Sequence, residues 1–280
     1  MLVPMGELLQ DGLKRKYALG AFDVCNLEMA ESVLQAAVDN SSPVIVAIAE
    51  GFFKEVRFET LVSCIKEQGA PLKIPVAIIL DHGRSYESCV RAIRAGVTSV
   101  MFDGSALPYE ENVRITRDVV RAARAVGVTS EAEVGHVGLG TEYEKTESGL
   151  TKPEEAAQFV ADTGVDALAV AVGTAHGKYK GEPKIHYDLL STIYDTVKMP
   201  LVLHGGSSTG DERLKRSIDY GIAKVNIYTD MAEEAKRRIK KTLDERYDKV
   251  RMNDLIHETR NAFREVATHY MQLFGSEGKA

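Results

Sequence analysis

The chain has 280 residues, 44% of them hydrophobic and 27% charged, and a net charge of -6. This composition supplies a large apolar core and excludes a disordered chain. The longest basic stretch, residues 236–241, has helical spacing and acidic neighbours, so we expect a solvent-exposed helix face and no nucleic-acid partner. No apolar run approaches the roughly 20 residues of a membrane span. Three cysteines without a C-x-x-C motif and an N-terminus without a signal pattern predict a cytoplasmic protein with no membrane association.

Short apolar, β-branched runs alternate along the whole chain with amphipathic segments such as Leu27–Asp39 and Glu110–Val126. The runs that we expect to be strands are Ala18–Phe22, Pro43–Ala49, Ile74–Leu80, Thr98–Phe102, Thr129–Ala132, Ala167–Val172, Leu201–Leu203 and Ala223–Val225. This alternation is typical of a parallel sheet. Eight such units without a break in composition predict an α/β fold, a (β/α)8 TIM barrel in one domain over residues 1–280, with a C-terminal helical extension past residue 245.

A doubly wound sheet is the structural alternative, because six of these units could form one. The Gly-rich candidate for dinucleotide binding, residues 135–140, has the wrong order for G-x-G-x-x-G and does not lead into a helix. We therefore expect residues 135–152 to form a long loop of the kind that serves as a lid or a binding loop.

Polar side chains follow six of the predicted strands. They are Asp81 and His82, Asp103, Glu133, Thr174–His176, His204 and Asn226. In a barrel these strand ends converge on one mouth, so the side chains would share a pocket. Asp81 or Asp103 alone could be an ordinary turn residue, and a single histidine is more often structural than functional. Three histidines at three strand ends favour a common site.

A catalytic zinc ion is commonly bound by three neutral imidazoles and keeps one coordination position open. In such a site the metal acts as a Lewis acid on a substrate oxygen. The sequence has no H-E-x-x-H helix and no H-x-H after the first strand, which disfavours a zinc protease or an amidohydrolase-like barrel. Asp103 and Glu133 supply hard oxygen ligands for a second divalent metal, a monovalent cation or an alternative position of the same ion. The small and hydroxyl residues in 204–208 and 226–229 lie where barrels hold phosphate, which predicts a phosphorylated substrate.

Across essentially the whole chain, these segments resemble the class II fructose-bisphosphate and tagatose-bisphosphate aldolases. The matching blocks, in the family's order, are Gly20–Asn26, Leu80–Gly83, Met101–Ser105, Glu131–Gly135, Val172–Gly177, Pro200–Ser207 and Lys224–Ile227. The resemblance implies a zinc-dependent lyase of carbohydrate metabolism and glycolysis. Its default reaction is cleavage of fructose 1,6-bisphosphate to dihydroxyacetone phosphate and an aldehyde such as glyceraldehyde 3-phosphate.

The resemblance also implies roles for individual residues. Asp81 matches the proton donor and acceptor at the hydroxyl next to the cleaved bond, and His82, His176 and His204 match the zinc ligands. Asp103 and Glu133 match a second or alternative metal position. The positions that match the dihydroxyacetone phosphate site are Gly177, Gly205, Gly206, Ser207, Asn226, Ile227, Tyr228 and Thr229. A homo-oligomer, a dimer or a tetramer, is implied as well, with the C-terminal extension as a candidate interface.

The sequence departs from the family pattern at three positions. Asp23 stands where the family has Asn, Ser208 where it often has Gly, and Tyr228 where bisphosphate aldolases often have Asp or Ala. Arg260 is the single candidate cation for a distal phosphate. We therefore expect an unusual aldehyde, with tagatose 1,6-bisphosphate or another ketose 1-phosphate as alternative substrates.

Two readings from other classes remain open. A barrel metallohydrolase acting on a phosphorylated substrate would use the same three histidines, and a non-catalytic sugar-phosphate-binding barrel would need neither them nor Asp81. We expect the other histidines to be structural: His136, His186, His257 and His269.

Overall fold

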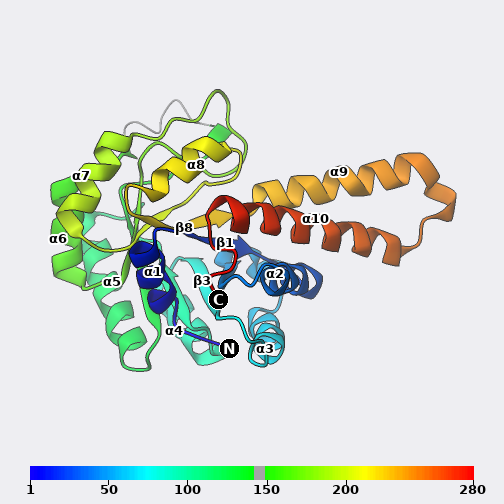
Figure 1. Ribbon diagram of the computed structural model, residues 1–280. Coiled ribbons are helices and arrows are strands. Elements are labelled where there is room, and N and C mark those ends of the chain that lie inside the picture. The colour runs from blue at the N-terminus through cyan, green and yellow to red at the C-terminus, as the bar shows by residue number, and fades with distance from the viewer. Residues whose placement is uncertain (142–148) are drawn as a thin grey trace.

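A closed barrel of eight parallel strands forms the centre of the computed structural model, which describes residues 1–141 and 149–280 (Figure 1). The strands pair in chain order, and β8 pairs with β1. They are β1 Leu19–Asp23, β2 Val44–Ala49, β3 Val76–Gly83, β4 Ser99–Phe102, β5 Thr129–Val134, β6 Ala167–Val170, β7 Leu201–Leu203 and β8 Ile222–Ile227. The predicted (β/α)8 barrel is confirmed, and every predicted strand overlaps an observed one.

Helices precede, separate and follow the strands. They are α1 Met5–Arg15, α2 Leu27–Asp39, α3 Phe58–Gly69, α4 Tyr86–Ala95, α5 Tyr109–Arg124, α6 Pro153–Thr163, α7 Tyr187–Val197, α8 Asp211–Ile218, α9 Thr229–Arg246 and α10 Met252–Leu273, with short 3-10 helices η1 Glu50–Lys54 and η3 Tyr247–Lys249. In residues 1–141 and 149–280, no helix combines the length and the apolar character that crossing a membrane requires.

Alternation along each strand divides the apolar residues into two cores. On β2, Ile45 and Ala47 belong to the cluster inside the barrel, whereas Val44, Val46 and Ile48 pack outward against the helices. Successive side chains of a strand point to opposite faces, so each strand contributes to both cores. The barrel interior is therefore filled with side chains rather than hollow.

Helix α1 closes the amino-terminal end of the barrel. Its Met5, Leu8 and Leu9 are buried in the interior cluster. The amide of Met5 donates to Ser99 Oγ at 3.1 Å, and that of Gly6 donates to Thr129 Oγ1 at 2.9 Å, which ties the helix to the starts of β4 and β5. The polar side chains lie at the opposite end of the barrel, where the strands have their carboxyl-terminal ends.

The C-terminal extension is a hairpin of two long helices. Figure 1 shows α9 and α10 projecting together away from the barrel, and α10 also packs on α2. The Tyr270 hydroxyl of α10 donates to Asp230 Oδ2 at 2.5 Å, in the first turn of α9. The returning helix is thereby anchored beside the barrel mouth.

Leu9→Ala should destabilise the protein by about 2–5 kcal/mol, because it leaves a cavity in the closed end of the barrel. Urea unfolding followed by far-UV circular dichroism measures this change. Gln10→Ala is the control in the same helix, since Gln10 is exposed and its truncation should change little. Equal effects of the two substitutions would contradict the role given to α1.

Candidate metal centre

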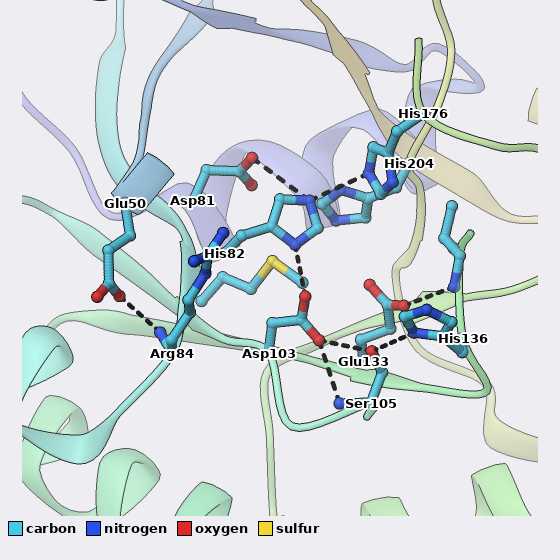
Figure 2. Close-up of polar contacts among 12 residues, drawn as sticks. Glu50, Asp81, His82, Arg84, Asp103, Ser105, Glu133, His136, His176 and His204 are labelled. Carbon is cyan, nitrogen blue, oxygen red and sulfur yellow. Dashed lines mark hydrogen bonds and ion pairs between the residues drawn. The ribbon is translucent and has the colours of Figure 1, made fainter. Parts of the chain in front are cut away.

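Three histidines from separate β/α units converge at the carboxyl-terminal mouth. His82 lies at the end of β3, His176 in the loop after β6, and His204 directly after β7. Figure 2 shows the three imidazoles side by side, with His82 Nε2 3.1 Å from His176 Nε2. One ring nitrogen from each lies within 4.8 Å of the other two. The predicted three-histidine cluster therefore exists as a geometric group that could hold a metal ion.

A bulge in β3 directs two neighbouring residues into the same pocket. Leu80 pairs with Val100 of β4 and Gly83 pairs with Phe102, so β3 advances by three residues while β4 advances by two. Within this bulge, His82 has a left-handed φ of 47°. Consecutive strand residues normally face opposite sides, and an extra residue with left-handed backbone changes that alternation. As a result, Asp81 and His82 both line the cavity at the mouth. The strand continues through both residues, rather than ending before them as predicted.

Carboxylates hold the second nitrogen of two of these histidines. His82 Nδ1 lies 2.7 Å from Asp103 Oδ2, and His204 Nε2 lies 3.1 Å from Glu131 Oε1. His204 Nδ1 is buried and has no partner among the described residues. Metal-binding histidines commonly have this arrangement, in which a carboxylate fixes the ring and its tautomer. The free nitrogens, Nε2 of His82 and Nδ1 of His204, thus suit a metal.

Electrostatics distinguish the imidazoles. Burial lowers the pKa of His176 to about 4, so this ring is neutral and its nitrogen can act as a ligand. Burial alone would also lower the pKa of His82, but the charge of Asp81 and the bond with Asp103 outweigh it and raise the pKa to about 10. A metal cation binding here would replace the proton of His82.

Asp103 and Glu133 form a second group with His82 on the other side of that ring. One ligand atom from each lies within 4.8 Å of the others. Glu133 Oε1 accepts the amide of Val137 at 2.9 Å, whereas Oε2 is buried without a partner in the part of the chain described. Burial and the nearby charge of Asp103 raise the pKa of Glu133 to about 8. This orphaned oxygen fits the predicted second cation position.

A cavity of about 170 Å³ opens beside the histidines. Its lining includes most of the predicted substrate residues: Gly177, Gly205, Ser207, Asn226, Tyr228 and Thr229, together with Asp23, Ala49, Phe52 and Asp81. Gly206 and Ile227 were predicted here but lie behind this wall. The amide of Gly206 donates to the carbonyl of Asn226 at 3.2 Å, and the Ile227 side chain is buried in the outer core.

The loop after β7 is tied to the start of α9. Ser207 Oγ accepts the amides of Tyr228 at 3.3 Å and Asp230 at 3.2 Å. Ser208 has a left-handed φ of 61°, and its amide and hydroxyl both donate to the Asp230 carboxylate at 2.9 Å. The amino-terminal end of α9, an 18-residue helix, thereby faces the cavity wall, where helix geometry favours an anion.

Sequence reasoning missed several residues of the site. Glu131 and Lys224 form a fully buried ion pair beneath His204. His136, expected to be structural, bonds through Nδ1 to Ser105 Oγ at 2.9 Å, and Ser105 Oγ donates to Asp103 Oδ1 at 2.7 Å (Figure 2). The sequence did contain a signal for the ion pair, because a Glu and a Lys each occur inside a strand that is otherwise apolar. Buried charges are normally paired, so these two residues could have been expected to contact each other.

Two further predictions concern regions away from the cavity. Arg260, the candidate for a distal phosphate, lies on α10, bound to Glu31 of α2, and lines a separate cavity between α2, α3 and α10. The predicted loop 135–152 is described at both ends, where the amide of His136 donates to the carbonyl of Gly149. Residues 142–148 of that prediction lie outside the described part of the chain.

A parallel barrel with three histidines, a buried aspartate and orphaned ligand atoms at its mouth defines a metal-dependent TIM-barrel enzyme. Comparison with known proteins places the chain more narrowly. It belongs to the class II fructose-bisphosphate aldolase family, whose sequence model matches residues 3–279. The protein is thus a carbon-carbon lyase of a metal-dependent family that acts on sugar phosphates.

The similarity to individual relatives extends over the full chain. The sequence is 41% identical to fructose-bisphosphate aldolase of Geobacillus stearothermophilus and 40% identical to the probable fructose-bisphosphate aldolase of Bacillus subtilis strain 168, covering 100% of this chain and 99% of each relative. The crystal structure of the YdjI aldolase from Escherichia coli K12 matches with a TM-score of 0.90 and 36% identity, covering 100% of both chains.

Gly205→Ala should destabilise the protein more than Gly177→Ala. Both glycines have left-handed backbone, with φ of 70° and 80°, so each substitution carries a similar strain of about 1–2 kcal/mol. A Cβ at Gly205 would lie 2.3 Å from the Ala175 carbonyl oxygen, whereas one at Gly177 would meet open space. Urea denaturation of both variants measures the free energy of unfolding, and the difference between them gives the cost of the clash at Gly205. Equal losses of stability would refute the close packing of the loop after β7 against the loop after β6.

Proposed function

We propose that the protein is a zinc-dependent ketose-phosphate aldolase that reversibly cleaves its substrate to dihydroxyacetone phosphate and an aldehyde, within one barrel domain over residues 1–280. The observation that carries this proposal is the convergence of His82, His176 and His204 beside the buried carboxylate of Asp81. The three imidazoles would hold the zinc. When bound, the ion stabilises the negative charge that cleavage leaves on the triose phosphate half.

Asp81 would take the proton from the hydroxyl next to the cleaved bond. Burial alone would raise the pKa of Asp81, but the charge of the adjacent His82 imidazole outweighs burial and lowers this pKa, so the carboxylate is ionised. The Asn226 amide donates to Asp81 Oδ1 at 3.0 Å, while Oδ2 lies 3.7 Å from His82 Nε2. A carboxylate fixed in this way beside the metal ligands can act as the general base in cleavage and as the acid in condensation.

Asp23 would serve as a neutral partner in the same pocket. Burial, followed by the charge of Asp81, raises the pKa of Asp23 well above its usual range. A protonated carboxyl has nearly the shape of the Asn that the family resemblance leads one to expect. Asp23 Oδ1 is buried without a partner among the residues described, and Asp23 lines the cavity. It is therefore available to hydrogen-bond the substrate.

The phosphate of the triose half would bind between the loop after β7 and the start of α9. Gly177, Gly205, Ser207 and Thr229 line this side of the cavity. Glycines let backbone amides approach an anion, and the amino-terminal end of α9 adds a favourable dipole.

The aldehyde half of the pocket supports an uncharged aldehyde rather than a phosphorylated one. Phe52 and Tyr228 form an apolar wall, with ring centroids 5.0 Å apart. Neither Lys nor Arg is among the described residues that line the cavity, and Arg260 is engaged with Glu31 elsewhere. A ketose 1-phosphate would therefore fit this chain at least as well as fructose 1,6-bisphosphate, the substrate that the names of its relatives indicate.

The remaining expectations are part of the same proposal. The three cysteines are free, which fits a reducing cytoplasm. A sugar phosphate is the expected small-molecule partner. We also propose a homo-oligomer, a dimer or a tetramer, with the projecting α9–α10 hairpin as the contact region.

Zinc-loaded protein should release dihydroxyacetone phosphate from at least one of fructose 1,6-bisphosphate, tagatose 1,6-bisphosphate and fructose 1-phosphate. Release should stop on addition of EDTA and return with zinc. A coupled NADH assay follows the triose phosphate, and fructose 1-phosphate should be cleaved at least as well as the bisphosphates. A strong bisphosphate preference would overturn the uncharged-aldehyde proposal alone. Release of inorganic phosphate without triose phosphate would replace the aldolase with the metallohydrolase.

Asp81→Asn should lower kcat by about 10²–10⁴-fold, because it removes the base. Asp23→Asn is the matched substitution of a neighbouring buried carboxyl, and its effect should stay below about tenfold, the equivalent of one hydrogen bond. Steady-state kinetics with equal zinc content in both variants measure the difference. Comparable losses in the two variants would contradict the assignment of Asp81 as the ionised group.

A further inference from the structure

A fully buried ion pair crosses the interior of the barrel. Lys224 of β8 donates through Nζ to both carboxylate oxygens of Glu131 on β5, at 2.9 and 2.8 Å, and neither side chain is exposed to solvent. Their neighbours inside the barrel form an apolar cluster. Removing two charges from water is costly, and replacing a buried pair by apolar residues is often neutral or stabilising. Stability therefore does not explain this pair.

The pair is connected to the metal centre through one oxygen. Glu131 Oε1 also lies 3.1 Å from His204 Nε2, and His204 is completely buried. A carboxylate accepts only, so Nε2 must carry the proton and the lone pair must reside on Nδ1. Nδ1 is the ring atom without a partner among the described residues. Glu131 thus selects the tautomer of His204 that presents a lone pair to the mouth.

Lys224 gives Glu131 its counter-ion. Glu131 also belongs, with Asp81 and His204, to an inner group whose ligand atoms lie within 4.8 Å of one another. The Lys224 ammonium already occupies both oxygens of Glu131. A cation would therefore gain less from Glu131 than from the three imidazoles above it.

We propose that Glu131 is a positioning residue for His204, that Lys224 keeps it in that role, and that this buried pair sets the affinity of the three-histidine site for its metal. The proposal rests on the proposed zinc site. It assigns to the pair an effect on metal binding that is separate from folding.

Two double variants test the proposal, and they differ only in the group at position 131. Glu131→Leu with Lys224→Met removes both charges and the hydrogen-bond acceptor. Glu131→Gln with Lys224→Met also removes both charges but keeps an amide oxygen that can accept the Nε2 proton. Neither variant leaves an unpaired buried charge.

Zinc affinity is measured by competition with a chromophoric chelator, and the site geometry by the visible spectrum of the cobalt-substituted proteins. The Leu/Met variant should bind zinc about 10–100-fold more weakly than the wild type, with an altered cobalt spectrum. The Gln/Met variant should recover most of the affinity and the wild-type spectrum. Urea unfolding of the metal-free proteins should show that both variants still fold cooperatively, because neither contains an unpaired buried charge.

Equal zinc affinity of the two double variants would overturn the positioning role while leaving the proposed aldolase intact. Wild-type protein that binds no zinc would overturn the proposed function itself. If a variant does not fold, a crystal structure of the zinc-loaded wild type gives an independent readout. Zinc on His204 Nδ1, with Nε2 against Glu131, supports the proposal, and zinc on Nε2 refutes it.

Discussion

Closure of the barrel with all strands parallel is the constraint on which the site depends. It places the carboxyl ends of β3, β6 and β7 on one rim, so that His82, His176 and His204 meet although they lie far apart in the sequence. Alternation within each strand would still send neighbouring residues to opposite faces. The bulge in β3 relieves this restriction locally and gives the mouth both Asp81 and His82. Because α1 fills the opposite end with apolar side chains, the polar groups are concentrated at a single opening.

The mouth contains several buried carboxyl groups, and the structure stabilises each one differently. Burial, followed by the charge of Asp81, raises the pKa of Asp23 and so favours its protonated form. Glu131 is neutralised by Lys224, and Glu133 faces away from the cavity toward the amide of Val137. Among the carboxyl groups of residues 1–141 and 149–280, Asp81 alone combines a lowered pKa with a place in the cavity lining. This division supports the proposal that Asp81 is the base, since the other buried carboxyls described at the mouth lack either the charge or the access to the cavity that proton transfer requires.

The sequence predicted the barrel, its strands and the three-histidine cluster, because these follow from hydrophobic period and from the common rim of parallel strands. It did not predict the bulge at His82, since a one-residue register shift has no sequence signal when the residue is not glycine. The Glu131–Lys224 pair was missed because the partners lie 93 positions apart and meet only across the closed barrel. The sequence could not place Arg260 for a related reason: helical period shows that α10 is amphipathic but not which surface of the barrel the helix covers, and in this chain Arg260 lies away from the cavity.

The three departures from the family pattern have separate structural consequences. Asp23 becomes nearly equivalent to Asn once its proton is retained, so the substitution changes little in shape. Ser208 adopts the left-handed backbone that Gly would take, and its two hydrogen bonds to Asp230 offset the strain. Both departures are compatible with the proposed triose-phosphate side of the pocket. Tyr228 differs, because it packs on Phe52 and adds an apolar surface to the cavity wall. A change of substrate in this chain should therefore affect the aldehyde and leave the phosphorylated three-carbon half as it is.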